Sequence, residues 1–108
     1  MEQEILQFVA VTSAGRAYDI DFPLHPQTRS ARVVSDLITA LLEAISQQAE
    51  SRQDISDGDI LQALAMTLAI RGRMLEAMAD TIAALSHELY ESAWGAARDA
   101  QSYAAARA

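Results

Sequence analysis

The chain of 108 residues has no cysteine and no lysine, only two prolines and four glycines, and an aromatic content of 6%. Without cysteine, disulfides, thiolate metal sites and cysteine nucleophiles are excluded. Disulfides are characteristic of oxidising compartments, so their absence fits a reducing cytosol. The sequence therefore predicts a cytoplasmic protein.

Long hydrophobic runs are also missing. The longest apolar stretch falls well short of the roughly 20 residues that a membrane-spanning helix needs. The segment Met1 to Glu4 is acidic, whereas a secretory signal peptide begins with basic residues. We expect no membrane association.

Motifs for catalysis and for phosphate binding are absent from the sequence. It contains neither a glycine-rich phosphate loop nor a G-x-S-x-G nucleophile turn. We therefore predict no catalytic residue and no cofactor.

Charge is unbalanced: the formal net charge is −7, and arginine supplies every basic side chain. Nucleic acids bind through neutralisation of their phosphates, which an acidic surface opposes. No nucleic-acid partner is expected. A strand–helix–helix DNA regulator, with paired strands in the major groove, remains the last-ranked alternative because Gln7, Val9 and Val11 place no basic side chain on the outer strand face.

What the sequence does contain is hydrophobic residues, at 51%, many of them alanine. The length predicts a single domain over 1–108. A β-hairpin is expected over about 4–22, with the turn Ser13-Ala14-Gly15-Arg16 and with Gly15 free to adopt a positive φ. Tyr18, Ile20 and Phe22 should share one face of the second strand, opposite Asp19 and Asp21.

Two helices are predicted to follow, over about 28–51 and about 57–94. The second has a clear start signal: Ser56 as N-cap, Asp59 three residues on, and the pair Ile55 and Ile60 as a hydrophobic staple. Gly72 disfavours helix by about 1 kcal/mol relative to alanine but need not end it. The alanine-rich tail over 95–108 could continue as helix or fray.

The long helix carries a heptad-like seam with three–four spacing. Its members are Leu61, Leu64, Leu68, Arg71, Leu75, Met78, Ile82, Leu85, Leu89, Ser92 and Ala96. At 1.5 Å per residue this helix would be about 55 Å long and the first helix about 36 Å, so part of the seam would lack cover.

The simplest cover for that part is a second copy of the chain. The predicted fold is mainly α with a short N-terminal β-hairpin, an antiparallel helical hairpin that dimerises into a four-helix bundle. The predicted dimer interface comprises Leu75, Met78, Ile82, Leu85, Leu89 and Trp94.

Five charged residues are candidates for ligand binding. Arg71 interrupts the seam, and its default interpretation is structural: it reaches solvent, pairs with an acid such as Glu43 on the first helix, or fixes the register of the helices. The less favoured alternative is an anionic ligand bound in a bundle core near Arg71 and Glu43. Arg16, Arg29 and Arg32 surround the start of the first helix, where positive charge opposes the helix dipole unless an anion binds there.

Histidines offer little for a metal site. His87, Glu88 and Glu91 do not complete the H-E-x-x-H motif, and the only other histidine is His25. We therefore predict no metal site.

Together these features favour a non-enzymatic, small, acidic helical homodimer acting as a protein-interaction, adaptor or chaperone-like accessory protein, with a protein partner possible. The first alternative is a ligand-binding or enzymatic helical bundle that holds an anion near Arg71.

Overall fold

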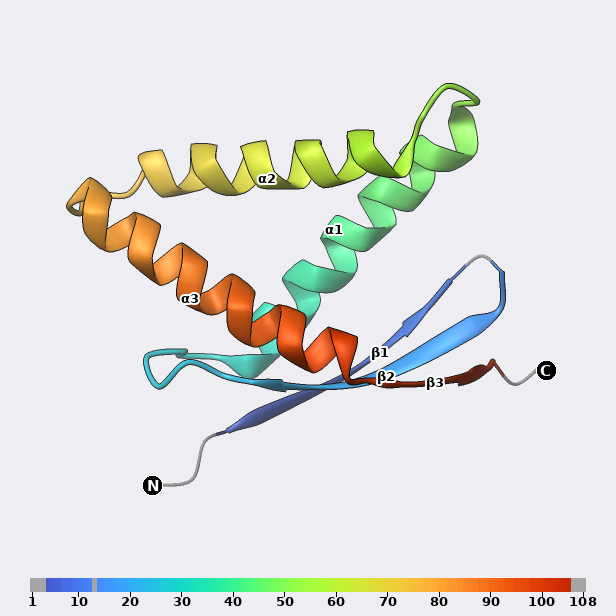
Figure 1. Ribbon diagram of the computed structural model, residues 1–108, viewed down its shortest axis with the longest axis horizontal. Coiled ribbons are helices and arrows are strands. Elements are labelled where there is room, and N and C mark those ends of the chain that lie inside the picture. The colour runs from blue at the N-terminus through green and yellow to red at the C-terminus, as the bar shows by residue number, and fades with distance from the viewer. Residues whose placement is uncertain (1–3, 13, 106–108) are drawn as a thin grey trace. The chain divides into compact units, whose positions relative to one another are not determined.

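The computed structural model describes residues 4–12 and 14–105. Its contacts divide the chain into two compact units. The first, here the sheet unit, is Met1–Ser35 together with Glu88–Ala108; the second, here the helical unit, is Asp36–His87. Figure 1 gives the order of the helices and strands along the chain.

The sheet unit begins with the predicted hairpin, which is confirmed. Strand β1, Ile5–Val11, pairs antiparallel with β2, Arg16–Pro23, and Phe8 lies opposite Ile20. The turn places Gly15 at a φ of 85°, a conformation that costs other residues about 1–2 kcal/mol. Ser13 of the predicted turn lies outside the described residues.

A third strand, β3, Gln101–Ala104, completes the sheet in the order β1-β2-β3 (Figure 1). It pairs antiparallel with β2, with Tyr103 opposite Ala17. The alanine-rich tail over 95–108 was predicted to continue as helix or to fray. This prediction was wrong for Gln101–Ala104, because pairing with a preformed strand outweighs the helix propensity of alanine. The last three tail residues lie outside the described part.

The core of the sheet unit is small. Ala17, Ile20 and Leu24 are its buried hydrophobic residues among those that the structure describes. Ile20 lies on the same face of the sheet as its partner Phe8, as the alternation along β2 predicts.

The first helix, α1, Ala31–Ser51, starts later than the predicted residue 28. The Ser30 Oγ accepts a hydrogen bond from the Val33 N–H at 3.2 Å. This satisfies one of the donors that a first turn leaves free, so the helix begins after Ser30. Its end at Ser51 agrees with the prediction.

The next helix, α2, Asp57–Arg73, begins where the capping signal predicts. The Ser56 Oγ accepts from the Asp59 N–H, and an Asp59 carboxylate oxygen accepts from the Ser56 N–H, both at 3.1 Å. This reciprocal capping box is confirmed, and it fixes the direction in which the chain leaves the loop.

The predicted single helix over 57–94 is wrong. The chain leaves the helix after Arg73, passes through Met74–Met78, and begins α3, Ala79–Arg98, after a five-residue connection. Gly72 is buried at this point, and a Cβ added to it would lie 2.9 Å from the Ile82 Cγ2. The glycine therefore permits a close approach of α3 to α2, which a continuous helix could not make.

The predicted fold class is accordingly corrected. The chain forms three helices and a three-stranded antiparallel sheet, not a helical hairpin with one very long C-terminal helix that assembles as a four-helix bundle. The seam is divided: Leu68 and Arg71 lie on α2, Leu75 and Met78 in the connection, and Ile82 on α3. The single-domain organisation stays a prediction.

No helix among the described residues is long and apolar enough to cross a membrane.

Candidate interaction surfaces

The helical unit has almost no core of its own. Across Asp36–His87 only Gly72, which has no side chain, is buried. Leu61 is 67% exposed, Leu68 50% and Met78 75%. Apolar side chains that would normally form a core are therefore exposed. The helical unit also contains two apolar grooves.

The first groove lies between the C-terminal half of α1, the loop after it and the N-terminal half of α2. Its volume is about 470 Å³, and the staple pair Ile55 and Ile60 contributes to its floor beside the capping box. Apolar side chains dominate its wall, with Arg52, Asp54 and Asp59 as its charged members. The lining residues are Leu41, Ala44, Ile45, Gln48, Arg52, Asp54, Ile55, Asp59, Ile60, Ala63, Leu64 and Thr67.

The second groove follows the bend between α2 and α3 and has a volume of about 690 Å³. Small side chains keep it open, because alanine occupies five of its lining positions and Gly72 another. Leu68, Leu75 and Ile82 supply its larger apolar surface, and Arg73 its only charge. Neither groove holds the set of convergent polar groups that orients a small-molecule substrate.

Arg71 and Glu43 are both exposed and form no ion pair with each other. The Arg71 Nη1 donates instead to the Met74 Sδ at 3.3 Å, across the end of α2. Neither residue lines either groove. The structure therefore does not bring these two candidates together, and a ligand-binding role for them stays a prediction.

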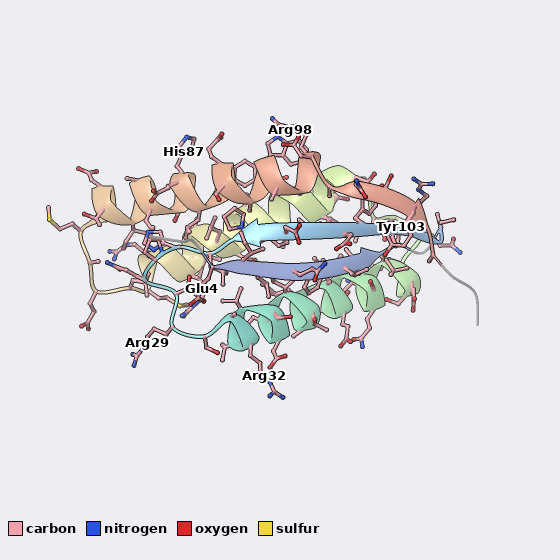
Figure 2. All side chains as sticks on the ribbon, turned by 90° about the horizontal axis from the view of Figure 1, so that it is seen from below. Glu4, Arg29, Arg32, His87, Arg98 and Tyr103 are labelled. Carbon is pink, nitrogen blue, oxygen red and sulfur yellow. The ribbon has the colours of Figure 1, made fainter. Side chains whose placement is uncertain are left out.

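The other three arginines do not converge either. Arg16 opens β2 and donates from Nη2 to the Ser102 Oγ at 2.6 Å, joining β2 to β3. Arg29 follows the other end of β2, a strand that is about 23 Å long at 3.3 Å per residue. Arg29 and Arg32 project away from the strands (Figure 2). The observed role of Arg16 is therefore a strand-to-strand contact, and an anion site shared by all three has no geometric support.

The histidine contact that the structure does form was not anticipated from the sequence. The His25 Nδ1 accepts from the Gln27 N–H at 3.1 Å, and its Nε2 lies 3.9 Å from a Glu88 carboxylate oxygen. No group of three or more potential metal ligands gathers anywhere in the described residues.

One charged pair on α3 is local. The Arg98 Nε lies 3.1 Å from an Asp99 carboxylate oxygen, and this hydrogen bond raises the pKa of Arg98 further above its ordinary value. Both side chains are exposed to solvent, so we assign the pair no role in binding.

The six predicted interface residues fall in different places. Leu75 and Met78 occupy the exposed connection between α2 and α3, and Ile82 lines the second groove. Leu85, Leu89 and Trp94 are exposed along α3. Their accessibility leaves each free to contact another chain, but their part in a dimer interface stays a prediction.

Sequence reasoning missed the first groove, although both of its elements carried a signal. Leu41 and Ile45 lie on α1, which was predicted as a helix, and Ile55 and Ile60 were interpreted only as a helix-start signal. No family model, no curated protein and no solved structure matches the chain.

Proposed function

We propose that this chain is a non-enzymatic, acidic homodimer of the cytoplasm that acts as a protein-interaction, adaptor or chaperone-like accessory protein. The observation that carries the proposal is the exposed apolar surface of the helical unit, where Gly72 alone is buried. Monomeric proteins rarely expose contiguous apolar patches beyond a few hundred Å², and larger ones mark interaction sites.

A second copy is the occupant that this surface favours. Every copy presents the same apolar side chains, and the first groove carries both signs of charge, Arg52 against Asp54 and Asp59. When two copies meet, Arg52 of one copy can therefore face an aspartate of the other. Packing of the chain's own two units against each other is the main competing explanation, and it predicts a monomer.

Self-association is tested by light scattering or sedimentation of the full chain over a range of concentrations. The variant Leu68→Gln removes an apolar side chain that is half exposed in the protomer, so its effect should fall on association. Full burial of an exposed leucine contributes about 1.5–3 kcal/mol, and burial of the exposed half of Leu68 would contribute about half of that. Two symmetry-related losses should therefore raise the dimer Kd at least about tenfold.

The matched control is Gln62→Ala on the same helix, which lines neither groove and should leave the Kd within about threefold. A monomer at micromolar concentration would contradict the proposal. An unchanged Kd for Leu68→Gln would exclude the second groove from the interface.

A further inference from the structure

Strand β1 has a free edge with none of the usual protection. It lies at one side of the sheet and pairs with β2 only, and no other described strand meets its outer edge. Its sequence, ILQFVAV, contains no charged residue, no proline and no glycine. Natural sheets protect exposed edges with charges, prolines, bulges or very short strands, so an edge of this kind acts as a template for another strand.

The hydrogen-bond pattern identifies which backbone groups face outward. The Thr12 N–H donates to the Arg16 carbonyl, and the Leu24 N–H donates to the Glu4 carbonyl, each at 2.8 Å. Hydrogen-bonded pairs alternate along an antiparallel ladder. The even-numbered residues of β1 therefore bond to β2, and the odd-numbered ones direct their backbone groups to the free edge. These are Ile5, Gln7, Val9 and Val11, whose side chains are also exposed.

The outward backbone groups of β1 can form hydrogen bonds with the same groups of β1 in a second copy of the chain. An antiparallel arrangement with a two-fold axis at Phe8 puts Ile5 opposite Val11, and Gln7 opposite Val9, of the second copy. All four outward residues are then paired, and the side chains of each pair share one face of the sheet. Moving the axis by two residues would leave part of the strand unpaired. Because β1 carries no charged residue, the pairing places no like charges of the two strands opposite each other.

We infer that β1 of one copy pairs antiparallel with β1 of a second copy about Phe8, joining the two three-stranded sheets into one. The inference rests on the self-association proposed above and specifies one of its contacts. Strand pairing alone buries little surface, so the exposed apolar side chains of the helical unit, such as those of Leu61, Leu68 and Met78, would supply the rest of the contact in the proposed dimer.

The first test removes one outward donor. Val9→Pro deletes an N–H that β2 does not use and places a ring at the edge, whereas the matched control Val9→Ala keeps the N–H. Light scattering on the full chain should show a dimer Kd raised at least tenfold for Val9→Pro relative to Val9→Ala. Far-UV circular dichroism checks that both variants keep the fold.

The second test determines which residues of the two β1 strands lie opposite each other, and it uses no proline variant. The chain has no cysteine, so an introduced thiol reports one position. Opposed residues 7 and 9 would have Cα atoms about 5.5 Å apart, within disulfide range. Identical positions are diagonal neighbours about 7–8 Å apart, beyond that range. Under mild oxidation, a mixture of Gln7→Cys and Val9→Cys proteins should form mixed disulfides at least tenfold faster than either variant alone forms its own.

The outcomes separate this inference from the proposed function. A monomer at micromolar concentration overturns both. A dimer that forms no preferred mixed disulfide overturns the β1 pairing alone and assigns the interface to the helices. Equal dimer Kd values for folded Val9→Pro and Val9→Ala overturn it as well. If Val9→Pro loses the fold, the disulfide result decides.

Discussion

Replacing Gly72 by alanine tests why the chain bends between α2 and α3. The added Cβ would lie 2.9 Å from the Ile82 Cγ2, whereas carbon atoms pack at about 3.5–4.0 Å. The methyl group belongs to a β-branched side chain whose χ1 is stiff, so it cannot move aside freely. Either α3 shifts from α2 or a side chain leaves its rotamer.

Two opposing effects set the magnitude. Alanine favours a helix over glycine by about 1 kcal/mol, whereas overpacking of this kind costs about 1–3 kcal/mol. We expect Gly72→Ala to lower the free energy of unfolding by up to about 2 kcal/mol. The matched control is Gly95→Ala on α3, where an added Cβ meets no atom within 4 Å. The free energy of unfolding of Gly95→Ala should rise by up to about 1 kcal/mol, because only helix propensity changes there.

Urea titration at one fixed protein concentration measures the difference, since association alters apparent stability. With a slope of about 1–3 kcal/mol per M, the midpoints of the two variants should differ by about 1 M. Adding Ile82→Leu to Gly72→Ala moves the branch away from the Cβ and should recover part of the loss. Equal stability of Gly72→Ala and Gly95→Ala would refute the close approach as the reason for the bend.

Three further predictions concern the turn, the cap and the charge. Gly15→Ala should destabilise the chain by about 1–2 kcal/mol in the same titration, because the φ of 85° strains any residue with a Cβ; no loss would contradict a left-handed turn. Ser56→Ala should cost about 1 kcal/mol, because the Asp59 N–H loses its acceptor, while Ser56→Asp, which restores an acceptor, should recover most of it. Raising the ionic strength from about 0.01 M to about 0.1 M should strengthen self-association, because the copies carry a net charge of −7 and repel each other. The added salt shortens the Debye length from about 30 Å to about 10 Å and so screens this repulsion. Weaker association in salt would indicate that opposite charges hold the copies together.

Local signals in the sequence predicted the local structure. The alternation from Tyr18 to Phe22 and the glycine at 15 led to the hairpin, and Ser56 with Asp59 led to the start of α2. Each of these features depends on residues within a few positions of one another. Their physical causes, side-chain alternation and satisfaction of the first helical N–H groups, can therefore be recognised without tertiary information.

The wrong predictions depended on contacts between distant residues. An unbroken apolar periodicity runs through Gly72, whereas α2 ends at Arg73 and α3 returns so closely that an added Cβ at Gly72 would lie 2.9 Å from the Ile82 Cγ2. Gln101–Ala104 forms a strand because β2 is available to pair with it, as the register of Tyr103 with Ala17 shows. The contact of Arg16 with Ser102 likewise joins residues that are far apart in the sequence, so the sequence alone did not indicate it.

The measurement that tests the central claim most directly is the mass of the purified chain in solution across a range of concentrations. The exposed apolar surface of the helical unit predicts a particle of twice 11.7 kDa at micromolar concentration and a melting temperature that rises with protein concentration. A particle of 11.7 kDa with a melting temperature independent of concentration would contradict it, because the apolar surface would then be covered within one chain.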